Sequence, residues 1–157
     1  MAIEKVREYF KTLGIEKRIM ELDVSSATVQ LASEALGCEP KRIAKSLSFM
    51  VSGKAILVVA GGDARVDNAK FKAQFGVKAK MLTPDEAVSL VGHAVGGVCP
   101  FAVNEGVCVY LDKSLTRFET VFPACGSSNS AIELTIGELE KYSLYTSWVD
   151  VCKDWEY

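Results

Sequence analysis

Two runs of apolar, strand-forming residues stand either side of one tight turn near the middle of the chain. The runs are KSLSFMV (45–51) and AILVVAG (55–61), and only Ser52-Gly53-Lys54 separates them. A short glycine-containing loop between two such runs is typical of an antiparallel β-hairpin. This hairpin constrains the fold more than any other feature, because it fixes a pair of adjacent antiparallel strands within a sheet.

Helix and strand signals alternate around the hairpin. Ser25 or Ser26 is placed to cap a helix that ends at Leu36. Capping-box patterns start two later helices, at Thr83 with Glu86 and at Thr135 with Glu138. Further strand-like runs are RIMELDVS (18–25), VCVYLD (107–112), ETVFPACG (119–126) and AIELT (131–135). This intermixing predicts an α/β or α+β fold, with a single domain over residues 1–157 built around a mixed sheet.

Composition excludes several classes of protein. The 157 residues are 49% hydrophobic and 24% charged, which suits one globular domain with a real core. A net charge of −2 argues against coating of nucleic acid, and DNA is not an expected partner. No apolar run is long enough for a membrane span, and the N-terminus does not look like a signal peptide. We expect a cytoplasmic protein, monomeric or weakly homodimeric.

The five cysteines are odd in number and form no CxxC pair. This pattern favours reduced, mostly buried thiols over a disulfide framework or a zinc site. One histidine and scattered thiols offer no metal-ligand spacing, so we expect no metal and no other cofactor.

Two lysine-bearing stretches are candidates for binding. Lys45 stands among apolar residues where a helical turn leads into a strand, and it is either a fixed cation beside a ligand or a solvated strand-start lysine. NAKFKAQFGVKAK (68–80) carries Lys70 and Lys72 among four lysines and no acidic residue. It is either a phosphate-facing patch or a solvated helix face.

GHAVGGVCPFAV (92–103) combines three glycines, one proline and the chain's one histidine, His93. Gly96 and Gly97 allow close approach to a ligand and exposure of backbone N–H groups as oxyanion-type donors. A plain surface turn is the alternative, and His93 by itself is more typical of a structural or surface residue than of a catalytic base.

A second polar cluster, ACGSSNSAIEL (124–134), lies between two expected strands. It is either a hairpin turn or a place where hydroxyls gather beside a ligand. No GxSxG, phosphate loop or recognisable Ser–His–Asp order is present. An enzyme built on this chain would work with a lysine, a backbone loop and the substrate's own groups.

Taken in order, these segments resemble the YbaK family of aminoacyl-tRNA deacylases, which includes the editing insertion of bacterial prolyl-tRNA synthetases. RIAKSLSF (42–49) is similar to the family's lysine segment, and Gly96 with Pro100 match its G-x-x-x-P loop. VVAGGDARVDNAKFK (58–72), ACGSSNSAIEL and TIGEL (135–139) complete a match over nearly the whole chain.

The resemblance implies a compact mixed fold, with a mostly antiparallel, curved, barrel-like sheet and helices around it. It also implies hydrolysis of the ester in a mischarged aminoacyl-tRNA that carries a small amino acid such as Ala, Ser or Cys, for example on tRNA-Pro. Attack would be assisted by the substrate's own groups. An aminoacyl-tRNA synthetase is a further candidate partner.

In that family the residue at Lys45 holds the terminal nucleotide, and the loop at Gly96–Pro100 positions the ester. The resemblance thus assigns catalytic positions to Lys45, Gly96 and Gly97. It makes substrate-binding candidates of Ser46, His93, Val98, Pro100, Phe101, Gly126 and Ser127, and tRNA-contact candidates of Lys70 and Lys72.

One position departs from the family's pattern. Many members have glycine where this chain has Ala102, and we expect an extended backbone there. The alternative functions are a tRNA- or synthetase-binding module of the same fold without catalysis, and an unrelated small-molecule binding domain.

Overall fold

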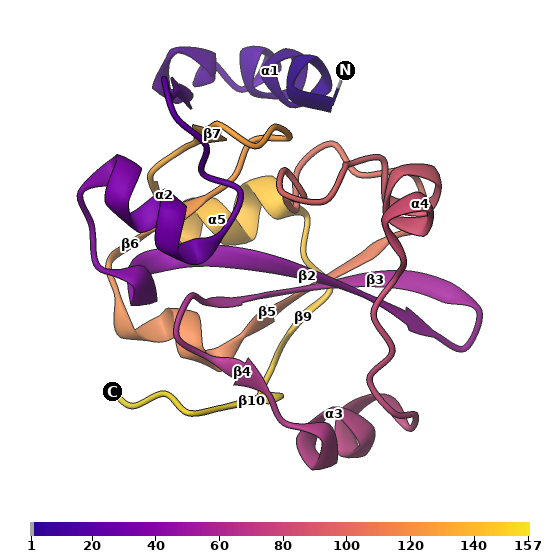
Figure 1. The fold of residues 1–157 in the computed structure, drawn as a ribbon. Helices are drawn as coiled ribbons and strands as arrows, with labels where there is room; N and C mark the ends of the chain where they lie inside the picture. Colours follow the sequence, from indigo (N-terminus) through magenta and orange to yellow (C-terminus); the bar gives the residue numbers. More distant parts are fainter. Residues whose placement is uncertain (1) are drawn as a thin grey trace.

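A six-stranded mixed sheet forms the centre of the molecule in the computed structural model, which describes residues 2–157 (Figure 1). The strand order is β8-β6-β2-β3-β5-β9. Their bounds are β2 (Ile43–Val51), β3 (Lys54–Gly61), β5 (Cys108–Asp112), β6 (Thr120–Pro123), β8 (Leu134–Thr135) and β9 (Ser147–Val149).

The predicted hairpin is confirmed as β2 and β3, the two longest strands. They pair antiparallel in register from Ala44 opposite Gly61 to Val51 opposite Lys54. Ser52 and Gly53 form the turn with φ values of 49° and 81°. Two positive φ values in a two-residue loop match the right-handed twist of the flanking strands.

Pairing in the sheet is mixed, as expected. β2 with β6, β3 with β5 and β5 with β9 are parallel, whereas β2 with β3 and β6 with β8 are antiparallel. Two small antiparallel ribbons add to these, formed by β1 (Met20–Glu21) with β7 (Ser130–Ala131) and by β4 (Arg65–Val66) with β10 (Cys152–Lys153).

Two expected strands differ from the prediction. The strand over 18–25 shrinks to β1, because Glu16–Arg18 forms a 3₁₀ turn (η1). The strand over 131–135 splits into β7 and β8, which pair with β1 and β6 respectively. The alternation of apolar and polar residues in so short a segment does not show with which strand each half of it will pair.

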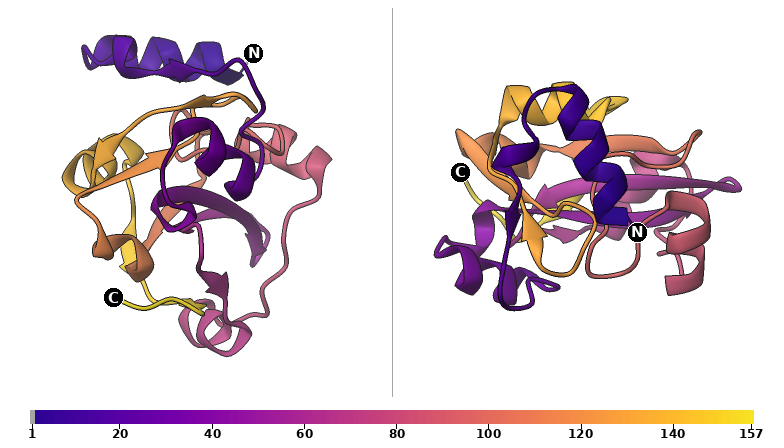
Figure 2. Two further views of the ribbon diagram at one scale, coloured as in Figure 1. Left: turned by 60° about the vertical axis from the view of Figure 1, so that its left-hand side comes forward. Right: turned by 90° about the horizontal axis from the view of Figure 1, so that it is seen from above.

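Helices cover the sheet on both faces (Figures 1 and 2). α1 lies across one end of the molecule and α3 lies at the opposite end. The helices are α1 (Ala2–Thr12), α2 (Val29–Leu36), α3 (Asn68–Phe75), α4 (Pro84–Glu86) and α5 (Ile136–Ser143). Shorter turns are η2 (Pro40–Arg42), η3 (Ala87–Val91), which continues α4 as a π-helix, and η4 (Lys113–Arg117). Both capping boxes form as predicted.

Two hydrophobic clusters occupy the two faces of the hairpin. Leu57 and Val59 join a cluster with Phe10 of α1 and Phe101, whereas Val58 joins a second cluster under α3. This alternation is what a strand buried on both sides requires. The five cysteines are free thiols, three of them buried. Within residues 2–157, no helix has the length and apolar character needed to cross a membrane.

Candidate functional site

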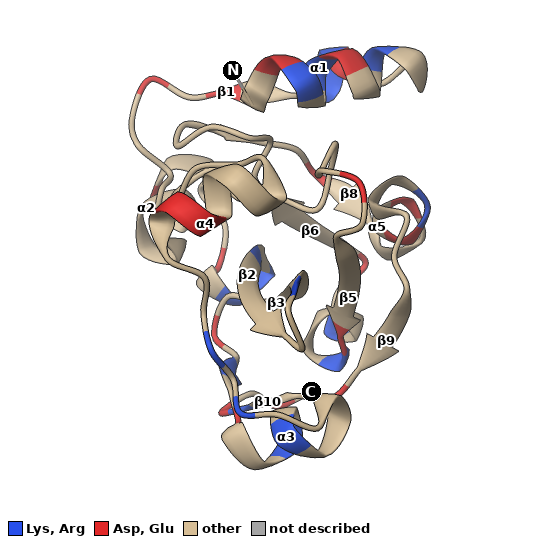
Figure 3. Cartoon of the chain, turned by 90° about the vertical axis from the view of Figure 1, so that its right-hand side faces the viewer, with Lys and Arg blue, Asp and Glu red and all other residues tan. Residues whose placement is uncertain are grey.

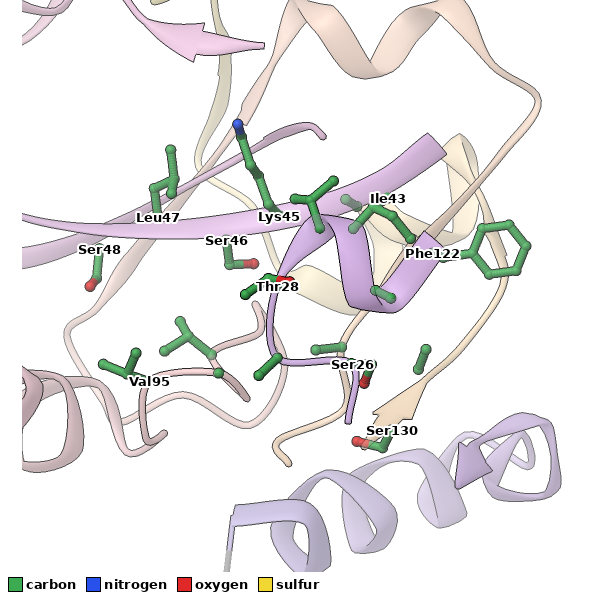
Figure 4. A pocket seen from close by; sticks show the side chains of 18 of the residues that line it. Ser26, Thr28, Ile43, Lys45, Ser46, Leu47, Ser48, Val95, Phe122 and Ser130 are labelled. Atoms are coloured by element: carbon green, nitrogen blue, oxygen red, sulfur yellow. The ribbon is translucent and has the colours of Figure 1, made fainter. Parts of the chain in front are cut away.

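A cavity of about 300 Å³ opens beside strand β2 (Figure 4). Residues from five parts of the chain line it: α2 with the residues before it, β2 from Ile43 to Ser48, Met81 and Leu82, the loop around Gly96, and the chain around β6 and β7. Its size is at the lower end of small-molecule sites. Among the residues that line it, Lys45 alone carries a formal charge.

The helix α2, which forms one wall, is capped two to three residues later than the sequence suggested. Thr28 is the N-cap, and its hydroxyl accepts from the Leu31 N–H at 3.1 Å. Ser26 was one of the two predicted caps, but its N–H donates to the Ser128 carbonyl at 2.6 Å. The stretch before α2 is therefore tied to the 124–134 segment, a contact 102 residues away along the chain.

Lys45 reaches away from the glycine-rich loop. Its ammonium donates to the carbonyl of Gly62 at 3.3 Å and to that of Ala64. An ammonium has three N–H donors, so one remains for a ligand. Burial of the half-buried side chain lowers the pKa of Lys45 from its usual value.

Successive side chains of β2 lie on opposite sides of the strand. Figure 4 shows Lys45 and Leu47 on one side and Ser46 and Ser48 on the other. All four line the cavity. The cavity therefore wraps around an edge of β2, with the cation on one side and the hydroxyls on the other.

The stretch 92–103, called here the glycine loop, is closed at its base. The Asn104 N–H donates to the Val91 carbonyl at 2.9 Å, and the Asn104 amide donates to the Ser89 carbonyl at 3.2 Å. Val95, Gly96 and Val98 of this loop line the cavity. Gly96 has φ +93°, which favours glycine, and no residue in 2–157 accepts a hydrogen bond from its N–H.

Gly97 does not present its N–H to the cavity, so this part of the expectation is wrong. Its N–H donates to the Ala94 carbonyl at 3.0 Å and closes a turn. A Cβ at Gly97 would lie 2.7 Å from the Ser127 nitrogen and 2.8 Å from the Gly126 carbonyl carbon. Gly97 is therefore required for close packing of the glycine loop against the 124–134 segment.

Gly126 and Ser127 lie behind the cavity rather than in its lining. The Ser127 hydroxyl is 2.7 Å from the hydroxyl of Ser130, which does line it. The predicted gathering of hydroxyls beside this site is therefore seen at Ser130, with Ser127 in support.

His93 is wholly buried and does not line the cavity. Its Nε2 lies 2.7 Å from the Phe101 carbonyl oxygen, so Nε2 carries the proton and donates. Burial lowers the pKa of His93, and its Nδ1 has no partner among residues 2–157. The imidazole is thus a neutral internal brace across the glycine loop, and the expectation of a substrate contact is wrong.

Cys99 is buried beside this brace. Its sulfur lies 3.5 Å from His93 Nε2 and 3.7 Å from the Phe101 carbonyl oxygen. Burial raises the pKa of the Cys99 thiol to about 12, so the thiolate needed for nucleophilic attack is absent at neutral pH. Among residues 2–157, no three His, Cys, Asp or Glu side chains group as a metal site would require.

Three further residues of the glycine loop were substrate-binding candidates, and one of them lines the cavity. Val98 lines the cavity, whereas Pro100 and Phe101 are buried behind it. Phe101 packs edge-on against Phe10, with ring centroids 4.8 Å apart. Ala102 has φ +51°, so the expected extended backbone is wrong and alanine occupies a conformation that favours glycine.

The two lysines expected to contact tRNA lie on α3, none of whose residues line the cavity. Lys70 donates to Asp150 at 3.1 Å and to the Cys152 carbonyl at 3.0 Å, and Lys72 lies in the last turn. Figure 3 shows basic residues continuing along the chain from α3 toward α4. Lys80 of that stretch directly precedes the lining residue Met81.

Sequence reasoning missed several lining residues, namely Thr28, Val29, Met81, Leu82 and Phe122. Thr28 was detectable in principle, because threonine is a favoured N-cap residue and a helical apolar run follows it. The others are apolar residues without a distinctive pattern.

A family model matches the part of the chain that holds the cavity, Lys45 and the glycine loop. The model of the aminoacyl-tRNA editing domain matches residues 24–142, more than half of the chain. This chain belongs to the aminoacyl-tRNA editing domain family. The segments that carried the resemblance, from the lysine strand through the glycine loop to the late serine cluster, all fall within the matched range.

Similar proteins fall into two groups by length. YwhH of Bacillus subtilis (strain 168) is 53% identical over 157 residues, which cover 99% of this chain and all of that protein. The proline–tRNA ligase of Geobacillus thermodenitrificans is 28% identical over 109 residues. That match covers 69% of this chain but only 19% of the ligase.

Solved structures share the fold over nearly their full length. A candidate trans-editing enzyme for prolyl-tRNA synthetase superimposes with a TM-score of 0.86 at 29% identity, covering 97% of each chain. The hypothetical protein APE2540 superimposes with a TM-score of 0.84 at 28% identity, covering 95% of this chain and 99% of that one. The mixed α/β fold with a curled sheet is therefore that of trans-editing domain structures.

Proposed function

We propose that this chain is a deacylase that hydrolyses the ester of a mischarged aminoacyl-tRNA carrying a small amino acid. The observation that carries this proposal is the character of the cavity wall. It holds one cation, Lys45, and several hydroxyls and backbone groups, but no carboxylate, imidazole or thiol. Such a wall can orient an activated ester, yet it supplies no strong base and no thiolate.

The reaction would then draw on the substrate. Water oxygen adds to the ester carbonyl carbon, the bond from that carbon to the ribose oxygen breaks, and a proton passes to the departing ribose oxygen. The neighbouring ribose hydroxyl is placed to relay that proton. Orientation of a reactive ester is worth several kcal/mol of barrier, so positioning can replace a protein nucleophile.

Lys45 and the glycine loop would hold different parts of the substrate. The free N–H of the Lys45 ammonium suits the terminal nucleotide, and the unpaired Gly96 N–H suits the ester carbonyl. Because Lys45 and Val95 of the glycine loop lie on opposite sides of β2 (Figure 4), the aminoacyl end would cross the edge of that strand at Ser46. For tRNA phosphates we favour Lys80, which directly precedes the lining residue Met81, over Lys70, which is paired with Asp150.

Purified protein incubated with a panel of mischarged tRNAs tests this function. We expect at least one small aminoacyl ester to be hydrolysed faster than in buffer. Lys45→Ala should lower kcat/KM about ten- to hundredfold, the range for a lost hydrogen bond to a charged group. Lys41→Ala is the matched control, since Lys41 is exposed, forms an ion pair with Glu39 just before the same strand and does not line the cavity.

Two outcomes would contradict the proposal. Hydrolysis of no ester above the buffer rate would remove the enzymatic function, and tight binding of aminoacyl-tRNA without turnover would favour the non-catalytic binding module. Full activity in Lys45→Ala would remove the role given to that residue.

A further inference from the structure

Strand β2 leaves part of one edge without a partner. Its other edge pairs with β3 from Ala44 to Val51. On the edge that faces the cavity, β6 pairs with Ile43 and Ala44, and residues 80–82 pair with the strand from Ser48 onward. Between these two pairings, residues 45–47 have no strand partner on this edge among residues 2–157. We call this stretch the open edge.

The register shows which backbone groups face the open edge. The Ser48 carbonyl accepts from the Leu82 N–H at 3.1 Å, and the Met50 N–H donates to the Lys80 carbonyl at 2.9 Å. In a β-strand, both polar groups of one residue point to the same edge, and every second residue shares that edge. The N–H and carbonyl of Ser46 therefore point into the open edge.

The Ser46 side chain adds a third unpaired group. Its hydroxyl is buried and has no hydrogen-bond partner among residues 2–157. It lies on the glycine-loop side of β2 (Figure 4), in the lining of the cavity. Buried hydroxyls in proteins are nearly always hydrogen-bonded, and an unmade bond is destabilising. A ligand that completes these bonds explains why the group is left open.

The chemistry of the wall narrows the choice of ligand group. An aminoacyl ester carries an α-amino group, which has two or three N–H donors and must find acceptors when it leaves water. No carboxylate lines the cavity, so neutral oxygens must accept them. Ser46 offers two such oxygens, its hydroxyl and its main-chain carbonyl, at one place.

We propose that Ser46 is the subsite for the free α-amino group of the substrate, which rests on the proposed deacylase function. The hydroxyl and the main-chain carbonyl of Ser46 both accept from this amine. The enzyme therefore selects amino acid esters over esters of the matching 2-hydroxy acids, in which one O–H replaces the amine.

A pair of nearly isosteric substrates tests this subsite. Alanyl-tRNA and lactyl-tRNA, on the same tRNA, differ only in the amine and the hydroxyl. Each enzymatic rate is divided by the buffer rate of the same ester, because the two esters differ in intrinsic reactivity. We expect the wild type to prefer the alanyl ester about tenfold or more, and Ser46→Ala to reduce that preference to a few-fold.

Ser147→Ala is the control. Ser147 is a serine of strand β9 that does not line the cavity, so the preference for the alanyl ester should not change. Circular dichroism and thermal unfolding confirm that both variants fold. Where alanine is not the preferred amino acid, the best substrate of the panel and its 2-hydroxy counterpart replace this pair.

The possible results distinguish a failure of the Ser46 subsite from a failure of the proposed deacylase function. Equal normalised rates for the two esters in the wild type would overturn the subsite while leaving the deacylase intact. An unchanged preference in Ser46→Ala would also overturn it. Hydrolysis of neither ester, nor of any other in the panel, would instead overturn the proposed function.

Discussion

The glycine loop and the open edge border the same cavity but differ in how many of their polar groups are hydrogen-bonded within the protein. The loop bonds to itself, through the Asn104 pairing at its base, the Ala94–Gly97 turn and the His93 brace on Phe101. The open edge leaves the Ser46 hydroxyl without a partner. Most polar groups of the loop therefore hold it as a preformed wall and leave the Gly96 N–H open, whereas the open edge of the strand leaves several groups of Ser46 for a ligand.

The largest effect is expected for Gly97→Ala, which tests whether the glycine loop is a tightly packed, preformed wall. Its Cβ would meet backbone atoms of Gly126 and Ser127, which cannot rotate away as a side chain can. We expect a loss of about 3 kcal/mol in the free energy of unfolding, measured by urea denaturation, and a loss of deacylation. Gly137→Ala in α5 is the control, since its Cβ would find no atom closer than 4.0 Å. Equal stability of the two variants would contradict the close packing.

Proline substitution tests the strand side. Leu47 points its N–H toward β3, so Leu47→Pro removes a sheet hydrogen bond and leaves a buried carbonyl unpaired, which costs about 1–3 kcal/mol. Ser46→Pro removes an N–H that faces the open edge and should destabilise the protein less. Thermal unfolding of both variants compares them directly. If Ser46→Pro is the more damaging, the assigned register of the edge is wrong.

The His93 brace predicts a pH dependence of stability. Burial lowers the pKa of His93 in the folded state. As the pH falls below about 6.5, the imidazole therefore becomes protonated in the unfolded chain while it is still neutral in the folded protein. Stability from this residue is therefore present above that pH and is lost as the pH falls. Lys5 of α1 acts in the same direction, since its charge also disfavours a protonated imidazole.

We expect the wild type to lose at most about 1 kcal/mol between pH 7 and pH 5.5 by this route, the limit for an imidazole that stays neutral while folded. His93→Gln, whose amide N–H can replace the Nε2 donor, should lose less over the same range. Urea denaturation at the two pH values measures both, and parallel losses in the two proteins would argue against a buried neutral imidazole. His93 is the chain's one histidine, so no other imidazole confuses the comparison.

The smallest effect is expected at the end of the glycine loop. Ala102 has φ +51°, where a Cβ is unfavourable and glycine is not. Glycine relieves the strain of the left-handed backbone but loses more conformational entropy than alanine when the chain folds. On balance, Ala102→Gly should stabilise the protein by about 0.5 kcal/mol, measured by thermal unfolding. Ala94→Gly is the control, because Ala94 has no positive φ and should be slightly destabilised. A loss of stability at Ala102 would contradict the strain.

Local patterns in the sequence predicted those elements that depend on neighbours along the chain. The hairpin, both capping boxes and the α2 end at Gly37 follow from turn, cap and glycine preferences within a few residues. Lys45, Ser46, Gly96 and Val98 were also chosen from the sequence, and all of them line the cavity.

The same patterns gave wrong roles where a distant segment decides. Ser26 was expected to cap α2 but bonds to Ser128, and the Gly97 N–H closes a turn rather than facing the cavity. His93 was by itself more typical of a structural or surface residue, and the family resemblance made it a substrate-binding candidate; the fold buries it against Phe101. Each error concerns a polar group with more than one available partner, and only the packing of remote segments selects among them.

The sequence alone was thus sufficient to predict a mixed fold around one hairpin and the two stretches that border the cavity, because turn and cap preferences depend on residues within a few positions of one another. Only the tertiary structure decided which side of β2 each group faces, which edge residues remain unpaired, and that His93 is internal. Those properties depend on pairing between strands far apart in the chain, such as β2 with β6, for which no local pattern exists.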